Sequence, residues 1–179
     1  MVDKGGVFMS DQVEIMRPLT WLKGIWLGEG KASFPTHKAY DYANEMKFRY
    51  MENAFEQEPL IHLEEIAWVL KDQEREFKHW ETGYFKPDGN GSIQLYLCHN
   101  TGRIEITYGS FLVVNPKERL FKIEFNSQSI RNDVGTKTAL QSRRELSYED
   151  GMLNYTLEMS TSDVPEMTHH LSAEMYKDQ

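Results

Sequence analysis

The residues best suited to chemistry in this sequence are its histidines, because imidazole binds metals and transfers protons near neutral pH. There are six, at positions 37, 62, 79, 99, 169 and 170. No pair has a metal-binding spacing such as His-x-x-x-His, and the adjacent His169 and His170 project to opposite faces of a strand. The spacing therefore argues against a zinc site built from protein side chains alone.

Other nucleophiles and acids are poorly placed for catalysis. There is no Gly-x-Ser-x-Gly elbow, and Cys98 lacks a clear nucleophilic context. As the single cysteine it also excludes an internal disulfide and a cysteine-rich zinc finger. The adjacent Glu64 and Glu65 are typical of a solvated strand edge rather than of an acid–base dyad.

One histidine is enough when the metal arrives inside a cofactor, because haem needs one strong axial ligand and an apolar slot. The segment 167–177 offers His169 and His170 for this role. His169 shares the parity of the apolar Leu171, whereas His170 does so only if the strand begins or bulges there. The residues alone leave open that both are rim histidines without a ligand role.

The elements that must position these residues begin with the stretch 18–36. Gly24, Trp26, Gly28 and Gly30 alternate there, and alternate residues of a strand share a face. Glycine inside a strand marks a bend or a close approach by another backbone. We therefore predict a first strand that bends around a buried Trp26 and plugs one end of a barrel.

The remaining chain reads as antiparallel strands joined by tight turns. Turn chemistry recurs at 87–92, 100–102, 115–118 and 149–151, between runs that alternate apolar and polar residues. About ten strands and no helix of three turns are expected, with one short helical turn at 17–23. The sequence thus predicts an all-β, single up-and-down antiparallel barrel, similar to fatty-acid-binding proteins and lipocalins, with room for one small ligand.

Composition limits the setting of this barrel. The chain has 179 residues and a formal net charge of −8, which argues against a nucleic-acid partner. Residues 1–16 are expected to form a flexible tail and 17–179 a single domain. No signal peptide or membrane-spanning run is apparent, so a cytoplasmic location is expected.

Several motifs together resemble the nitrobindins, a family of small haem-binding β-barrels. They are Gly24-Ile-Trp-Leu-Gly-Glu-Gly30 followed by Phe34-Pro-Thr36, then His79-Trp-Glu-Thr-Gly83, Thr101-Gly-Arg-Ile-Glu105, Thr136-Lys137 with Arg144, Met159, and His170-Leu171. The resemblance covers residues 17 to 177. Two departures are Ala32, where many relatives have glycine, and His37, where an aliphatic residue is usual.

The resemblance implies a function as well as a fold. It implies a ten-stranded barrel that binds ferric b-type haem (heme b) through one histidine, binds nitric oxide reversibly and isomerises peroxynitrite to nitrate. His170 corresponds to the axial ligand and catalytic residue, with His169 as the second choice, and Thr36 and Lys137 correspond to haem-contacting positions. This route needs no distal acid, and the sequence offers no clear one unless His37 points inward. An apolar cavity wall suits the route better than a hydrogen-bonding one.

An alternative of another class is a carrier of fatty acids or other small lipophiles. Gly24-x-Trp26 also resembles the first-strand signature of lipocalins, and Arg144 is a candidate interior cation for a ligand carboxylate. The expected partners are thus haem and small reactive nitrogen species, or a lipophile. The sequence leaves the oligomeric state open, with a homodimer as one option.

Overall fold

The computed structural model describes residues 19–51, 60–72, 74–87, 92–115, 120–135 and 137–178. The predicted tail, 1–16, lies outside these ranges. Within them a short 3-10 helix η1 is followed by ten strands: η1 Thr20–Leu22, β1 Gly24–Phe34, β2 His37–Met51, β3 Leu60–Lys71, β4 Glu74–Pro87, β5 Ser92–His99, β6 Ile104–Asn115, β7 Leu120–Arg131, β8 Ala139–Glu149, β9 Met152–Thr161 and β10 Thr168–Lys177. In the described part of the chain, no helix is long and apolar enough to span a membrane.

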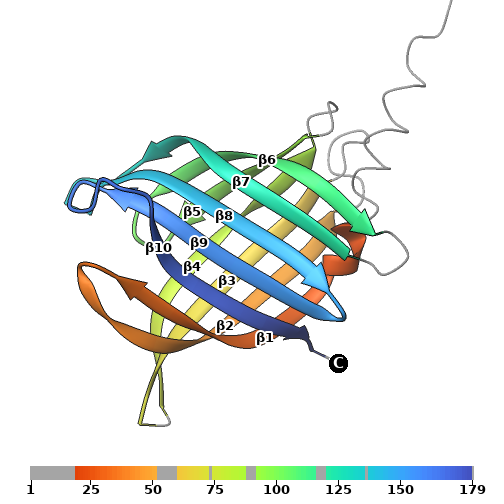
Figure 1. Ribbon diagram of the computed structural model, residues 1–179, viewed down its shortest axis with the longest axis horizontal. Helices are drawn as coiled ribbons and strands as arrows, with labels where there is room; N and C mark the ends of the chain where they lie inside the picture. The colour runs from red at the N-terminus through yellow and green to blue at the C-terminus, as the bar shows by residue number, and fades with distance from the viewer. Residues whose placement is uncertain are drawn as a thin grey trace, which may run out of the picture.

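The strands form one closed antiparallel barrel in which sequence neighbours are also spatial neighbours (Figure 1). Strand β1 pairs with both β2 and β10, which closes the sheet and leaves no open edge. The β8–β9 hairpin turns through Asp150 and Gly151, both with positive φ, as a tight two-residue turn requires. The predicted up-and-down barrel of about ten strands is confirmed.

The glycines of β1 let β10 approach closely. A Cβ on Gly28 would lie 1.9 Å from the carbonyl oxygen of Glu174, and one on Gly30 would lie 2.2 Å from that of Ser172. Neither position therefore tolerates a side chain without moving the backbone of β10. The predicted close approach of a second backbone is confirmed, and that backbone belongs to the last strand.

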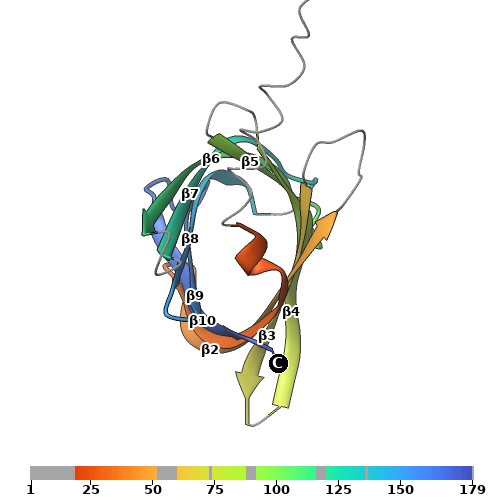
Figure 2. The same ribbon diagram turned by 90° about the vertical axis from the view of Figure 1, so that its right-hand side faces the viewer.

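Trp26 closes one end of the barrel together with η1. Its side chain is buried, and its indole Nε1 donates a 2.7 Å hydrogen bond to the carbonyl oxygen of Leu22. The ring meets Tyr148 edge to face at 5.7 Å. Figure 2 shows the helical turn inside the lumen at this end. The sequence predicted Trp26 as the plug, and the structure adds η1 to it.

Candidate functional site

A cavity of about 470 Å³ occupies the other half of the barrel, where β1 ends and β10 begins. This volume falls in the range of about 300–1,000 Å³ that is typical of ligand pockets. Apolar and aromatic side chains cover much of its wall: Ala32, Phe34, Tyr40, Tyr42, Ala67, Leu157, Met159 and Leu171. Polar and charged side chains come from opposite sides of the mouth and from the floor: Thr36, His37, Glu65, Lys78, His79, Glu81, Thr101, Arg103, Asn132, Lys137, Arg144, Tyr155, Thr161 and His170.

His170 enters the cavity because β10 is irregular at this residue. The pairing of β10 with β9 shifts register between His169 and Leu171, so His170 has no partner in the ladder. His170 and Leu171 therefore both line the cavity, while His169 is exposed and does not. The sequence predicted that His170 points inward only if the strand begins or bulges at this residue, and the structure shows a bulge.

The imidazole of His170 is held neutral in an apolar setting. Burial, reinforced by the positive potential of His37 and Arg103, lowers its pKa to about 4. Its ring packs edge to face on Phe34 at 5.3 Å. Its Nδ1 atom is buried and has no hydrogen-bond partner among the described residues. A neutral imidazole with an uncommitted ring nitrogen is suited to metal coordination.

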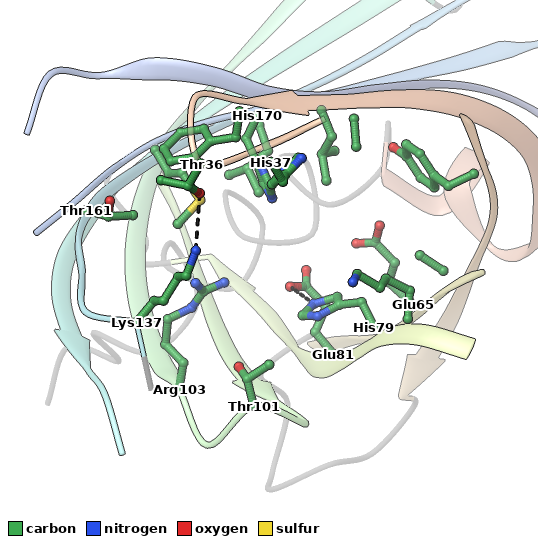
Figure 3. A pocket seen from close by; sticks show the side chains of 18 of the residues that line it. Thr36, His37, Glu65, His79, Glu81, Thr101, Arg103, Lys137, Thr161 and His170 are labelled. Atoms are coloured by element: carbon green, nitrogen blue, oxygen red, sulfur yellow. Dashed lines mark hydrogen bonds and ion pairs between the residues drawn. The ribbon is translucent and has the colours of Figure 1, made fainter. Parts of the chain in front are cut away.

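Thr36 and Lys137, the two positions that the resemblance predicts to contact haem, both line the cavity. The ammonium of Lys137 donates a 3.2 Å hydrogen bond to the hydroxyl of Thr36 (Figure 3). Lys78 and Arg103 also line the cavity, and Lys78 lies 5.9 Å above the ring of Tyr40. The entrance is therefore basic although the chain carries a formal net charge of −8, which favours an anionic ligand.

His37 lines the mouth on the same side as His170. The two rings lie 5.7 Å apart, and the Nδ1 atom of His37 is 2.9 Å from the carbonyl oxygen of Lys38. In Figure 3, His37 and His170 face the opposite wall together. His37 is therefore not placed as a group facing His170 across the cavity.

The wall opposite His170 carries a cluster that the sequence did not predict (Figure 3). The Oε2 atom of Glu81 lies 3.3 Å from Nε2 of His79 and 2.9 Å from Nδ1 of His99. These two histidine nitrogens are 3.4 Å apart. The expected apolar wall is not found on this side, because β4 turns His79 and Glu81 inward and β5 places His99 opposite Glu81.

Below this cluster, Arg144 is fully buried between two carboxylates. It donates hydrogen bonds to Glu81 at 3.0 Å, to Glu105 at 3.4 Å and to the hydroxyl of Tyr155. Burial alone would raise the pKa of Glu81, but the charge of Arg144 outweighs it and holds that pKa well below its usual range. Arg144 holds the pKa of Glu105 low in the same way, aided by His99 and Arg103. Both carboxylates are therefore ionised at neutral pH.

Glu65 differs from the solvated edge residue that was expected. Its side chain lies in the interior and lines the cavity. Burial, followed by the nearby charge of Glu81, raises its pKa well above the usual value. Glu64 agrees with the expectation, because it is partly exposed on the outer face. Glu65 does not, because it is a buried acid kept protonated by its surroundings.

The inward parity of β4 was the available signal for this cluster. Gly83 and Phe85 are buried and share parity with His79 and Glu81, so the two polar residues belong to the interior face. His99 carries the same signal, because it shares parity with the buried Ile93, Leu95 and Leu97 of β5, and the register of β5 on β4 then sets it against Glu81. The sequence identified the correct strands, but not which polar residues they turn inward.

The comparisons with known proteins agree with this architecture. Residues 15–177 match the family described as "THAP4-like, heme-binding beta-barrel domain". "Peroxynitrite isomerase Rv2717c" of Arabidopsis thaliana is 30% identical over 152 residues, covering 85% of this chain and 82% of the relative. "Peroxynitrite isomerase" of Nocardia farcinica is 29% identical over 157 residues, covering 88% and 87%. The crystal structure of Rv2717c from M. tuberculosis superposes with a TM-score of 0.82 at 23% identity, over 92% of this chain and 98% of that one.

Proposed function

Because this chain belongs to the nitrobindin-like family of heme-binding β-barrel domains, we propose that it binds one ferric b-type haem through His170 and isomerises peroxynitrite to nitrate. The observation that carries this proposal is the bulge in β10. Because of this bulge, the side chain of His170, whose buried Nδ1 atom has no hydrogen-bond partner among the described residues, points into the cavity of about 470 Å³.

The residues of the cavity fit such a cofactor. The neutral imidazole of His170 suits an iron ligand, and the side chains of Phe34, Leu157 and Met159 supply apolar surface for the porphyrin faces. Lys137 and Thr36 lie at the mouth, where an ammonium and a hydroxyl can hold propionate carboxylates in contact with solvent. These contacts would leave the side of the cavity that faces His79 for a small ligand.

When bound, ferric haem supplies a Lewis-acidic coordination position that an anionic oxidant or nitric oxide can occupy. The chain's own residues would guide and hold that ligand. Lys78 and Arg103 make the entrance attractive to an anion. His79 faces the same space and is positioned by Glu81, so it could offer a hydrogen bond to an anion held in that space.

A fatty-acid carrier is less well supported by the same cavity. Such a carrier needs an interior cation available for the ligand carboxylate. Arg144 is the interior cation expected from the sequence, but it is already bonded to Glu81 and Glu105. A lipid carboxylate would have to displace one of these internal partners.

Titration of the purified protein with hemin tests the cofactor assignment. We expect a stoichiometric haem absorption band for the wild type and for His169→Ala, whose side chain is outside the cavity. His170→Ala should lose the axial ligand and bind hemin far more weakly. Equal binding by wild type and His170→Ala, or loss confined to His169→Ala, would overturn the assignment.

Stopped-flow measurement of peroxynitrite decay tests the reaction. The hemin-loaded protein should accelerate decay relative to the haem-free protein, give nitrate as the main product and reduce nitration of a bystander tyrosine. An unchanged decay rate, or increased bystander nitration, would leave haem and nitric oxide binding without isomerase activity.

A further inference from the structure

We propose a second ligand site on the cavity wall, in which His79, Glu81 and His99 bind a divalent metal ion of the zinc class. Nε2 of His79, Oε2 of Glu81 and Nδ1 of His99 form a compact triangle of possible ligand atoms. The site is distinct from the haem ligand His170, because His79 and Glu81 lie across the cavity from it (Figure 3).

The spacing of the three atoms is that of ligands around one metal ion. They are separated by 3.3, 2.9 and 3.4 Å. Ligands at about 2.0–2.2 Å from a zinc ion lie roughly 3.0–3.5 Å from one another in tetrahedral or octahedral arrangements. An ion can therefore enter the triangle with only small side-chain adjustments.

The surroundings provide the outer contacts that metal ligands usually have. The second ring nitrogen of His99, Nε2, lies 3.3 Å from Oε1 of Glu105, and a carboxylate is a usual partner for the second nitrogen of a metal-bound histidine. This Nε2 atom is buried and has no hydrogen-bond partner within the described residues. The Oε1 atom of Glu81 is held by Arg144 at 3.0 Å, which leaves Oε2 directed at both histidines.

The donor set and its exposure favour a zinc-class ion with an open coordination position. Two imidazoles and one carboxylate are the ligands of many catalytic zinc sites, which keep a fourth position for water or substrate. His79 and Glu81 line the cavity, whereas His99 lies behind them and is buried. The fourth position would therefore face the cavity and could accept an anion there.

Positive charge nearby opposes a cation, and buried carboxylates can offset it. A guanidinium nitrogen of Arg103 lies 3.3 Å from Nδ1 of His99, and Arg144 contacts Glu81. The buried carboxylates of Glu81 and Glu105 lie 2.9 and 3.3 Å from the ring nitrogens of His99. Their negative charge, together with an anion at the open position, would compensate the added charge.

Titration of the haem-free protein with Co²⁺ and Zn²⁺ tests the site directly. Co²⁺ in a site with nitrogen and oxygen ligands gives visible absorption bands that zinc should abolish by competition. We expect one equivalent per chain, with affinity reduced by at least about tenfold in His79→Gln and in His99→Gln. Zinc-loaded crystals should show anomalous scattering between the three residues.

Two control variants separate this site from other histidines. His62→Gln removes an outer-face imidazole that contacts the hydroxyl of Thr82 at 2.8 Å, and it should bind the metal like wild type. His170→Ala should also retain the metal, although the neighbouring His37 and His170 form a second pair of imidazoles.

The outcomes decide the proposal as follows. Loss of the metal in His79→Gln and His99→Gln, with both controls unaffected and an unchanged unfolding midpoint, supports it. Should His99→Gln unfold because its side chain is buried, the partly exposed His79→Gln decides alone. Unaltered binding in His79→Gln, or loss in His170→Ala only, overturns the proposal and places the metal elsewhere.

Discussion

The two halves of this barrel are built from the same strands, but one has a filled interior and the other contains a cavity. The half around Trp26 is filled by apolar side chains and closed by η1. The half around His170 contains a cavity, and beneath it Glu65, Glu81 and Arg144 are buried in the same interior. One half derives its stability from packing, while the other retains buried charges that stabilise only when every partner is present.

The difference between the two halves shows where a barrel of this kind can bind a ligand. A filled interior leaves no room for a ligand, whereas a cavity floor held by paired charges stays open and polar without collapsing. The pairing of Arg144 with Glu81 and Glu105 fixes the floor, and His79 and His170 then face each other across the remaining space. Burial of these charged groups lowers the stability of the fold, and packing in the apolar half offsets that loss.

Truncation of Trp26, which plugs the filled end of the barrel, should produce the largest loss of unfolding free energy. Trp26→Ala is expected to lower the free energy of unfolding by about 3–5 kcal/mol, because it leaves a large void and removes the hydrogen bond to Leu22. Urea denaturation measures this. Trp80→Ala, on the exposed outer face of β4, is the matched control and should change little. Equal midpoints for Trp26→Ala and wild type would remove the role of the plug.

Breaking one charge pair tests the polar half. Glu81→Gln keeps the shape of the side chain but leaves the buried Arg144 with a weaker set of acceptors. We expect a loss of about 3 kcal/mol in unfolding free energy at pH 7. Thermal or urea unfolding measures it. A variant as stable as wild type would mean that Arg144 is adequately paired by Glu105 and Tyr155 alone.

The neutral state of His170 predicts a pH dependence in the haem-free protein. Its pKa is lowered to about 4 from 6.5, so between these values the unfolded chain binds more protons and stability falls as pH falls. Between pH 7 and 5, His170→Asn should lose roughly 2 kcal/mol less unfolding free energy than wild type. Buried carboxylates with lowered pKa values contribute mainly below this window.

His169→Asn is the control for this measurement, because its side chain is exposed beside the same bulge. It should follow the wild-type pH profile. Parallel profiles for wild type and His170→Asn would show that the imidazole of His170 is not shielded from protons in the folded protein.

Glu65→Gln should have the smallest effect and the opposite pH trend. The raised pKa of Glu65 means that the folded protein holds a proton that the unfolded chain releases above about pH 4.5, so this residue destabilises increasingly as pH rises. The neutral amide removes that penalty. At pH 7 the variant should be as stable as wild type or more stable, in contrast to Glu81→Gln. A loss as large as that of Glu81→Gln would show that Glu65 is ionised.

The sequence by itself determined the barrel and much of its closed end. Alternating apolar and polar residues with turn chemistry between them specify half-buried antiparallel strands, and this information is local. The glycines around Trp26 likewise predicted a close backbone approach, which β10 supplies at Gly28. The terminal histidines were also recognised, with a bulge as the condition for His170 to point inward.

Only the tertiary structure decided which polar residues share the cavity. His79 and His99 are 20 residues apart, and they meet because β5 pairs with β4 in the register that sets His99 against Glu81. Glu64 and Glu65 look alike in sequence, yet pairing of β3 with its neighbours buries one and not the other. Register and barrel closure are non-local, and a shift of one residue exchanges the inner and outer faces of a strand. That is why the strands could be predicted from the sequence, and the polar floor between them could not.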